Sequence, residues 1–203
     1  MRDLRMTGAV VLVAHEAPGA SGLCGSPAGL IARAAASATG MPLESLRITH
    51  ACPHCGSVDH GRPLVETVPA GERVCAVSFS RSVGFEAAAA TRREAIGIDI
   101  ESIGNVSQHR VADVVLHSAE RGTVDGLPHD EAARRLAHHW MAKEAILKLT
   151  GDGLRVPPSE LQLRIIGDRV ILVSWPHGID LDVAPSVTLF TVSHDVVGAL
   201  AVR

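Results

Sequence analysis

Aromatic side chains are scarce in this chain, whose 203 residues include three Phe, two Trp and no Tyr. The hydrophobic share is still 46%, so the core has to be built from Ala, Val, Leu and Ile. Proteins that hold single-stranded nucleic acid stack its bases on aromatic side chains. The scarcity of aromatics argues against such a platform, and the net charge of −3 argues against a general nucleic-acid surface.

Long apolar runs are missing as well. The longest run near the N-terminus, 8–14, ends at His15 and Glu16 and falls short of the roughly 20 apolar residues that cross a bilayer. No clear secretory signal stands there either. We therefore expect a cytoplasmic protein without a membrane or nucleic-acid partner, most simply a monomer made of one large domain or two small ones.

Cysteine is sparse, with four residues: Cys24, Cys52, Cys55 and Cys75. Four are too few for a disulfide framework in a chain of this length. Cys52 and Cys55 form a CxxC pair, with His50 and His60 nearby. A structural zinc site needs four ligands, commonly from two such pairs. Two interpretations stay open for this segment: a metal site completed by His50 or His60, or a plain loop with free thiols.

Periodicity and turn residues predict strands and one helix in the first half of the chain. The expected strands are 8–14, 44–49, 74–80 and 95–101. The expected helix covers 28–39, with Ser26 as its cap and Pro27 at its first position. The alanine-rich segment 84–91 fits a strand or a helix, and 51–63 is expected to be a loop.

Helices are more prominent in the second half. We expect a helix from 108 to about 117 capped by Ser107, a short helix at 118–125 and a long one at 130–149. The expected strands are 161–166, 170–173, 188–193 and 196–202. Both halves thus combine strands with helices, which predicts an α+β protein of two similar lobes with a seam near 94–97.

Acidic side chains stand in two of these elements. Asp99 and Glu101 are two apart in a strand and so point to the same face. Glu144 and Lys148 share a helical stripe with Trp140. Solvated acids and a surface ion pair are the plain interpretations, but Trp140 favours a half-buried face. Three converging carboxylates suit Mg²⁺ and, with a lysine, favour phosphoryl-type transfer.

Two segments carry a family resemblance. Residues 97–101 (GIDIE) and 140–148 (WMAKEAILK), about forty residues apart, resemble the signature (I/V)G(I/V)D…(W/F)xxKE(A/S)xxK of the 4'-phosphopantetheinyl transferases. Upstream, 60–63 (HGRP) resembles the family's G(K/R)P loop and 78–82 (SFSRS) its S(L/V/I)SH(S/A) strand. Segment 117–122 resembles the stretch with a glutamate between the two main motifs. A length near 200 residues with two lobes resembles the Sfp-type branch of the family.

The resemblance implies a fold and a reaction. The fold is a pseudo-twofold pair of α+β lobes, 1–96 and 97–203, with the active site between them. The reaction is the Mg²⁺-dependent transfer of the 4'-phosphopantetheine arm of coenzyme A to a serine of an acyl or peptidyl carrier protein, with release of 3',5'-ADP. Polyketide or nonribosomal peptide biosynthesis is the implied setting. The alternative is a catalytically inactive member that binds coenzyme A or a carrier protein.

The resemblance also implies roles for particular residues. The implied metal ligands are Asp99, Glu101 and Glu144. The implied coenzyme A contacts are Arg62, Ser80, Arg81, Lys143 and Lys148, with Arg33, or else Arg47, for the 3'-phosphate. The implied catalytic residues are Glu144, Glu120 and Lys148. Either glutamate is a candidate base for the serine hydroxyl, and the sequence leaves this choice open. Arg81 replaces a histidine of many members, and it can pair with phosphate but cannot shuttle a proton.

Overall fold

Two antiparallel sheets form the frame of the computed structural model, which describes residues 1–15, 26–52, 55–108, 111–179 and 181–203. The first sheet contains β1 (Arg2–Met6), β2 (Ala9–His15), β3 (Leu46–Ala51), β4 (Arg62–Thr67), β5 (Arg73–Ser82) and β6 (Phe85–Thr91). The second contains β7 (Ile96–Ser102), β8 (Gln162–Ile166), β9 (Arg169–Ser174), β10 (Ser186–Thr191) and β11 (Val196–Val202). Their strand orders are β1-β2-β6-β5-β4-β3 and β7-β11-β10-β9-β8.

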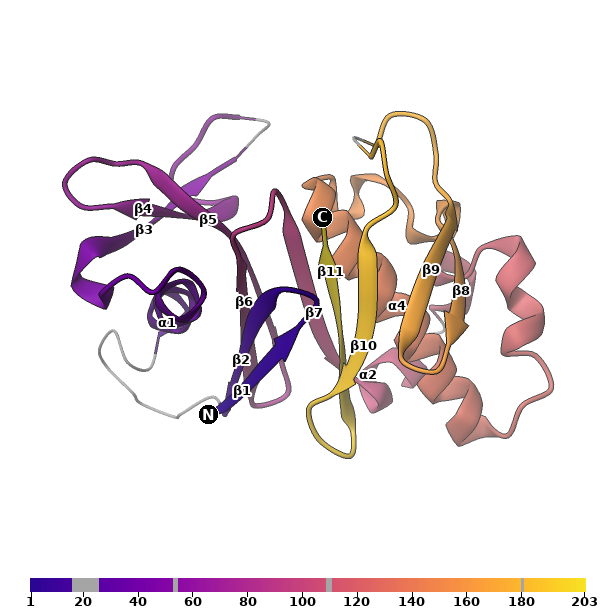
Figure 1. Cartoon of the computed structure of the whole chain (residues 1–203). Coiled ribbons are helices and arrows are strands. Elements are labelled where there is room, and N and C mark those ends of the chain that lie inside the picture. The colour runs from indigo at the N-terminus through magenta and orange to yellow at the C-terminus, as the bar shows by residue number, and fades with distance from the viewer. Residues whose placement is uncertain (16–25, 53–54, 109–110, 180) are drawn as a thin grey trace.

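Helices cover the outer faces of the sheets. The α-helices are α1 (Pro27–Thr39), α2 (Ile103–Gln108), α3 (Ala112–Val115) and α4 (His129–Thr150). Short 3-10 turns are η2 (Leu43–Ser45), η3 (Ser118–Thr123), η4 (Gly153–Arg155) and η5 (Pro158–Glu160). Figure 1 shows α1 beside the first sheet and α4 beside the second, with the two sheets between them. In the part of the chain described, no helix is both long and apolar enough to cross a membrane.

Three apolar clusters correspond to the three contacts between these layers. One joins α1 to the first sheet and another joins α4 to the second. The third lies between the sheets, where Val11 and Ala89 of the first meet Ile98 and Ile100 of the second. Burial of apolar area at these contacts is the main force that holds the layers together. The prediction of an α+β protein is confirmed, and its strands form two sheets.

The alanine-rich segment is a strand, β6, because both of its faces are covered. Ala88 and Ala90 pack in the cluster with α1, whereas Ala87 and Ala89 pack between the sheets. The side chains alternate between the two faces, as strand geometry requires. Periodicity could not decide between strand and helix here, since alanine satisfies both patterns when every position is buried.

The single helix expected from 108 to about 117 is not found among the described residues, because α2 ends at Gln108 and α3 covers only Ala112–Val115. Ser107 lies inside α2, and its hydroxyl bonds back to the carbonyl of Gly104 at 2.9 Å. The helix begins at Ile103, where the Ser102 hydroxyl accepts a hydrogen bond from the Asn105 N–H at 3.4 Å. The Ser107 cap was therefore wrong, whereas the Ser26 cap is confirmed, since its hydroxyl accepts from the Gly29 N–H at 3.2 Å. The loop expected at 51–63 ends in strand, because β4 starts at Arg62.

Gly97 brings α4 close to β7. A Cβ at this position would lie 1.9 Å from the carbonyl oxygen of Ala145 and 2.6 Å from the backbone nitrogen of Leu149. Both atoms belong to the helix backbone, which cannot move aside as a side-chain end can. A glycine is therefore required for this close approach, which brings the end of α4 next to Asp99 on the same face of β7.

Gly97→Ala should lower the free energy of unfolding by at least about 2 kcal/mol, because the helix or the strand must shift to admit the methyl group. The matched control is Gly122→Ala, where nothing lies within 4 Å of the added Cβ. The control should change stability by no more than about 0.5 kcal/mol. Urea unfolding of both variants measures the difference, and equal losses would contradict the close contact.

Candidate active site between the two sheets

Alternate serines of β5 join the two sheets. The hydroxyls of Ser78, Ser80 and Ser82 accept hydrogen bonds from the backbone N–H groups of Ile98 (3.1 Å), Ile100 (3.2 Å) and Ser102 (3.2 Å). β7 is the edge strand of its sheet and pairs with β11 on its other side. Without the serines, the N–H groups of Ile98 and Ile100 would be buried and unpaired, which is costly. The serines therefore hold β7 against β5 in one register.

Two of these serines also hold the acids of β7. The Ser80 hydroxyl donates to Asp99 Oδ1 at 2.7 Å, and the Ser82 hydroxyl donates to a carboxylate oxygen of Glu101. Glu101 also accepts from the Ser102 N–H at 2.6 Å and from the Asn105 amide at 3.1 Å. Each serine thus accepts from the backbone and donates to a carboxylate, so the seam between the sheets also positions the acids.

Asp99 is paired with a cation from α4. Lys148 Nζ lies 2.6 Å from Asp99 Oδ1, and the aspartate side chain is almost completely buried. Burial raises the pKa of Asp99, whereas Lys148 and the Ser80 hydroxyl lower it and the negative charge of Glu101 raises it. The Lys148 side chain is 30% exposed, so it remains accessible to a ligand.

Glu144 stands one helical turn before Lys148 and carries an unpaired oxygen. Its Oε1 is buried without a hydrogen-bond partner among the described residues. The pKa of Glu144 is raised to about 7, chiefly by burial and also by the charge of Asp99, against the lowering effect of Lys148. A buried carboxylate oxygen without a donor, close to a second carboxylate, is unfavourable unless a cation or proton joins it.

These acids suit a hard divalent cation. The donors of Asp99, Glu101 and Glu144 are carboxylate oxygens, the atoms that Mg²⁺ prefers, and the unpaired Glu144 oxygen offers a free position. The three are looser than a preformed cage, however. Among the described residues, their ligand oxygens do not come within 4.8 Å of one another as a group of three.

A cavity of about 550 Å³ opens beside Lys148, between strands of the first sheet and the end of α4. Gly61, Arg62 and Ser78 line one side, and Lys148 and Asp152 line the other. Arg62 reaches across to donate to the carbonyl oxygens of Lys148 and Leu149, at 2.6 Å each. These carbonyls lie in the last turn of α4, where helix geometry leaves them without intrahelical partners.

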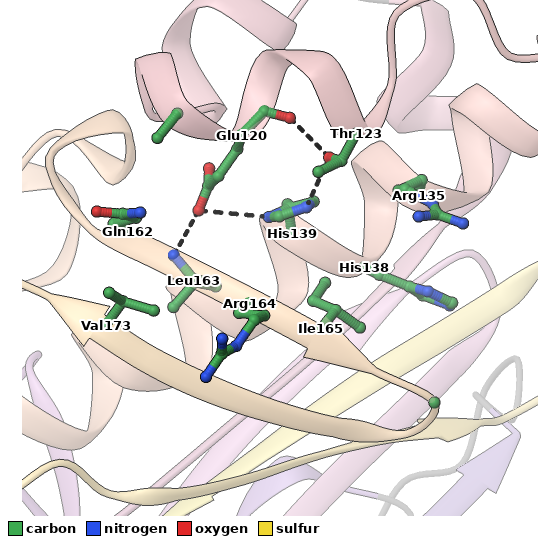
Figure 2. Close-up of a pocket in the computed structure, with 12 residues that line it drawn as sticks. Glu120, Thr123, Arg135, His138, His139, Gln162, Leu163, Arg164, Ile165 and Val173 are labelled. Atoms are coloured by element: carbon green, nitrogen blue, oxygen red, sulfur yellow. Dashed lines mark hydrogen bonds and ion pairs between the residues drawn. The ribbon is translucent and has the colours of Figure 1, made fainter.

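Lys143 and Glu120 form a separate buried cluster. Lys143 is fully buried and donates to Glu120 Oε2 at 2.6 Å and to the Val115 carbonyl at 2.7 Å. Glu120 also accepts from the backbone N–H groups of His117 at 2.8 Å and Leu163 at 2.5 Å. The second of these contacts appears in Figure 2. The pKa of Glu120 is lowered, because contacts with His139, Lys143 and Leu163 outweigh the effect of burial.

The structure therefore places the expected site residues in two separate groups, one around Asp99 and Lys148 and one around Glu120 and Lys143. The charged groups of Lys143 and Glu120 are satisfied by each other and by backbone. Like the three acids Asp99, Glu101 and Glu144, they do not line the cavity beside Lys148. Glu120 instead borders a different cavity with Thr123, Arg135 and His139, shown in Figure 2. The helical stripe alone could not reveal this, because Lys143 turns toward η3 rather than toward β7.

Two other arginines that the resemblance implies, Arg33 and Arg81, do not line the cavity beside Lys148. Arg33 lines another hollow, between α1 and β3, together with Arg47. Arg81 is exposed on β5, opposite Glu86 of β6 in the strand register. The positions that sequence reasoning missed are Ser78 and Ser82, whose bonds to β7 complete the seam. The sequence did contain an indication of their role, because serine occupies every second position from 78 to 82.

Comparison with known proteins identifies the family of the chain. A model described as the 4'-phosphopantetheinyl transferase superfamily matches residues 95–199, from the start of β7 almost to the end of β11. This stretch is slightly more than half of the chain, and the chain belongs to the 4'-phosphopantetheinyl transferase superfamily.

Solved structures show a more distant likeness. One is a holo-(acyl-carrier-protein) synthase from Bacillus anthracis str. Ames in complex with CoA (3',5'-ADP). Its sequence identity to this chain is 24% and the TM-score is 0.44. The match covers 53% of this chain and 93% of the synthase chain. The holo-ACP-synthase from Plasmodium yoelii has 19% identity and a TM-score of 0.42, covering 53% and 91%. No curated protein sequence matches the chain.

Lys143→Met should lower the free energy of unfolding by about 3–5 kcal/mol at neutral pH, because it leaves the Glu120 carboxylate buried without its cation. Arg135→Met is the matched control on the same helix, since its ion pair with Glu131 at 3.4 Å is exposed. The control should lose less than about 1 kcal/mol. Denaturant titration compares them, and a loss for Lys143→Met as small as that of the control would contradict a structural role.

Proposed function

We propose that this chain is an Sfp-type 4'-phosphopantetheinyl transferase. It moves the 4'-phosphopantetheine arm of coenzyme A to a serine of an acyl or peptidyl carrier protein, and 3',5'-ADP leaves. The observation that carries the proposal is the Asp99–Lys148 ion pair, whose charges act on Glu144, a buried residue with an unpaired carboxylate oxygen. Membership of the superfamily supports the reaction class.

The proposed active site lies between an N-terminal lobe, 1–96, and a C-terminal lobe, 97–203. Support for this division comes from the sheets, since one uses strands up to Thr91 and the other strands from Ile96 onward. A chain of 203 residues with a complete sheet in each lobe is typical of the Sfp-type branch. Carrier proteins of polyketide or nonribosomal peptide biosynthesis are the proposed partners.

Asp99, Glu101 and Glu144 are the proposed ligands of Mg²⁺. When bound, the ion neutralises the diphosphate of coenzyme A and so makes the phosphorus easier to attack. The carboxylates suit this task because the serines of β5 already hold two of them in place. Ser80 is accordingly a positioning residue in this proposal, since its hydroxyl is committed to Asp99 and to the Ile100 N–H.

Lys148 is the proposed phosphate ligand. Its side chain is partly exposed and lines the cavity, and its ammonium lies next to Asp99, where it can compensate charge on the diphosphate. Arg62 forms the opposite wall and is the proposed contact for the adenosine-side phosphates. Arg81 is exposed on the neighbouring strand and remains a candidate for an outer phosphate, as does Arg33 in its own hollow on the N-terminal lobe.

Glu144 is the better candidate for the base. Attack by the carrier serine forms an O–P bond to the β-phosphorus and breaks the bond to 3',5'-ADP, and the hydroxyl proton must go to an acceptor. Glu144 has a carboxylate oxygen without a partner, whereas both oxygens of Glu120 already accept hydrogen bonds. Glu120 and Lys143 are therefore proposed to stabilise the C-terminal lobe.

Asp99→Asn and Glu144→Gln should each lower the rate of transfer at least about 100-fold, because each removes a charged oxygen from the reacting site. The assay is the mass shift of an apo carrier protein mixed with coenzyme A and Mg²⁺. Glu131→Gln is the control, since this glutamate is exposed on the first turn of the same helix. It should keep full activity.

Unchanged transfer by both site variants would refute the proposed ligands. Coenzyme A binding by the wild type without any mass shift on a panel of apo carriers would favour the inactive binding module instead. Circular dichroism of each variant confirms that a loss of activity is not a loss of fold.

Lys148→Ala should weaken coenzyme A binding by about tenfold, the effect of losing one charge-assisted hydrogen bond to phosphate. Arg169→Ala removes the same charge from an exposed position on β9 that does not line the cavity. Calorimetric titration should give this control the wild-type affinity. Equal affinities for the two variants would move the phosphate site away from α4.

A further inference from the structure

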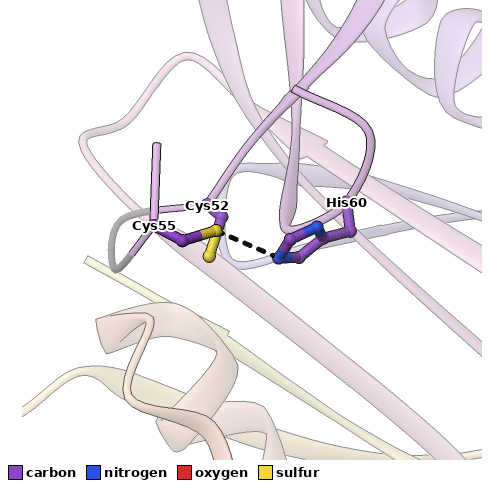
Figure 3. A group of neighbouring side chains, drawn as sticks. All are labelled: Cys52, Cys55 and His60. Atoms are coloured by element: carbon purple, nitrogen blue, oxygen red, sulfur yellow. Dashed lines mark hydrogen bonds between the residues drawn. The ribbon is translucent and has the colours of Figure 1, made fainter. Parts of the chain in front are cut away.

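Three metal-ligating side chains gather on the loop between β3 and β4. Cys52, Cys55 and His60 place one ligand atom each so that all three lie within 4.8 Å of one another (Figure 3). Cys55 Sγ is 3.4 Å from His60 Nε2. Among the residues that the structure describes, no other three histidine, cysteine or acidic side chains come as close. His50, the other candidate of the sequence, is not a member of this group.

Backbone hydrogen bonds shape the start of this loop. The Gly56 N–H donates to the Cys52 carbonyl at 3.0 Å, and the Cys52 N–H donates to the Ser57 carbonyl at 2.9 Å. Gly56 has a φ of 70°, the left-handed region that turns the chain back directly after Cys55. The turn therefore brings the second cysteine back to the first, independently of any side-chain packing.

The end of the loop is pressed against its start. Gly61 has a φ of 105°, and a Cβ there would lie 2.5 Å from the Ala51 carbonyl oxygen and 2.7 Å from Cys52 Cα. Only glycine permits this approach, and the preceding residue is His60. The close approach of the two ends of the loop therefore places the His60 imidazole near the two thiols.

Apolar burial does not account for the cluster. Cys55, Val58 and His60 are exposed, and Cys52 is only partly buried. Ordering an exposed loop costs conformational entropy that has to be offset by some other interaction. Two thiols and an imidazole in an exposed position are ligands that a soft or borderline metal ion prefers.

We propose that Cys52, Cys55 and His60 bind Zn²⁺. The Cys-x₂-Cys spacing is the usual spacing of a zinc-binding cysteine pair, and histidine is the usual third type of ligand. Zinc is four-coordinate in most protein sites, so one position is left for water or another donor. Both thiols bind as thiolates, and binding releases their protons to solvent.

The metal would fix one wall of the cavity beside Lys148. Cys52, Gly61 and Arg62 all line that cavity, and His60 is two residues from Arg62. Holding both ends of the loop would keep Arg62 aimed at the last carbonyls of α4. This consequence for coenzyme A binding rests on the proposed function, but zinc binding itself does not.

The first test is the metal content of the full chain, purified without chelators from cells grown with zinc. We expect about one zinc ion per chain by mass spectrometry of the metal. Cys52→Ser, Cys55→Ser and His60→Asn should each lower this content at least about tenfold. His50→Asn is the matched control and should keep it. A wild type without zinc, or Cys55→Ser with full zinc, would overturn the proposal.

A second measurement guards against variants that fold poorly. Stripping the wild type with a chelator should lower its thermal midpoint, and added Zn²⁺ should restore it, because a ligand that binds the folded state stabilises it. Cys55→Ser should show no such response. A Cys52–Cys55 disulfide in the freshly purified protein, seen as a mass two hydrogens lower, would overturn the zinc site. These readouts do not depend on whether the chain transfers phosphopantetheine.

Discussion

The hydrogen bonds from the backbone N–H groups of β7 to the serine hydroxyls of β5 are the constraint on which the site depends. An edge strand buried between two sheets has donors that must be paired, and side-chain hydroxyls at every second residue pair them. The same hydroxyls of Ser80 and Ser82 hold Asp99 and Glu101. At Ser80 and Ser82, the hydroxyl that joins the two sheets is therefore also the one that positions an acid.

Buried charged groups on two faces of α4 differ in whether their hydrogen bonds are satisfied. Lys143 and Glu120 neutralise each other in a buried pair, and each also forms hydrogen bonds with backbone groups. One residue further along the helix, Glu144 is buried with an unpaired oxygen beside the Asp99–Lys148 pair. The first arrangement stabilises a fold, whereas the second is unfavourable until a ligand completes it. This contrast supports the assignment of the site to the Glu144 side.

Sequence patterns predicted much of the fold and part of the site. The strand with Asp99 and Glu101, the long helix with Glu144 and Lys148, and the Ser26 cap follow from local periodicity and capping chemistry. The Ser107 cap failed because Ser102, at the end of a strand, accepts the helix N–H instead. The pairing of Lys143 with Glu120 was also missed, because a helical wheel shows only which residues share a stripe. It does not show what packs against each stripe.

The sequence alone determined the two acidic motifs, their elements and the family resemblance, since these depend on residue type and spacing over a few turns or strand positions. Only the tertiary structure decided which charges meet. Residues 99 and 148, or 120 and 143, are far apart along the chain, and their contacts exist because β7, α4 and η3 pack in one particular way. The same holds for Cys52 and His60, which the closed hairpin brings together. Local pattern specifies the elements, but burial and backbone pairing over long range specify their neighbours.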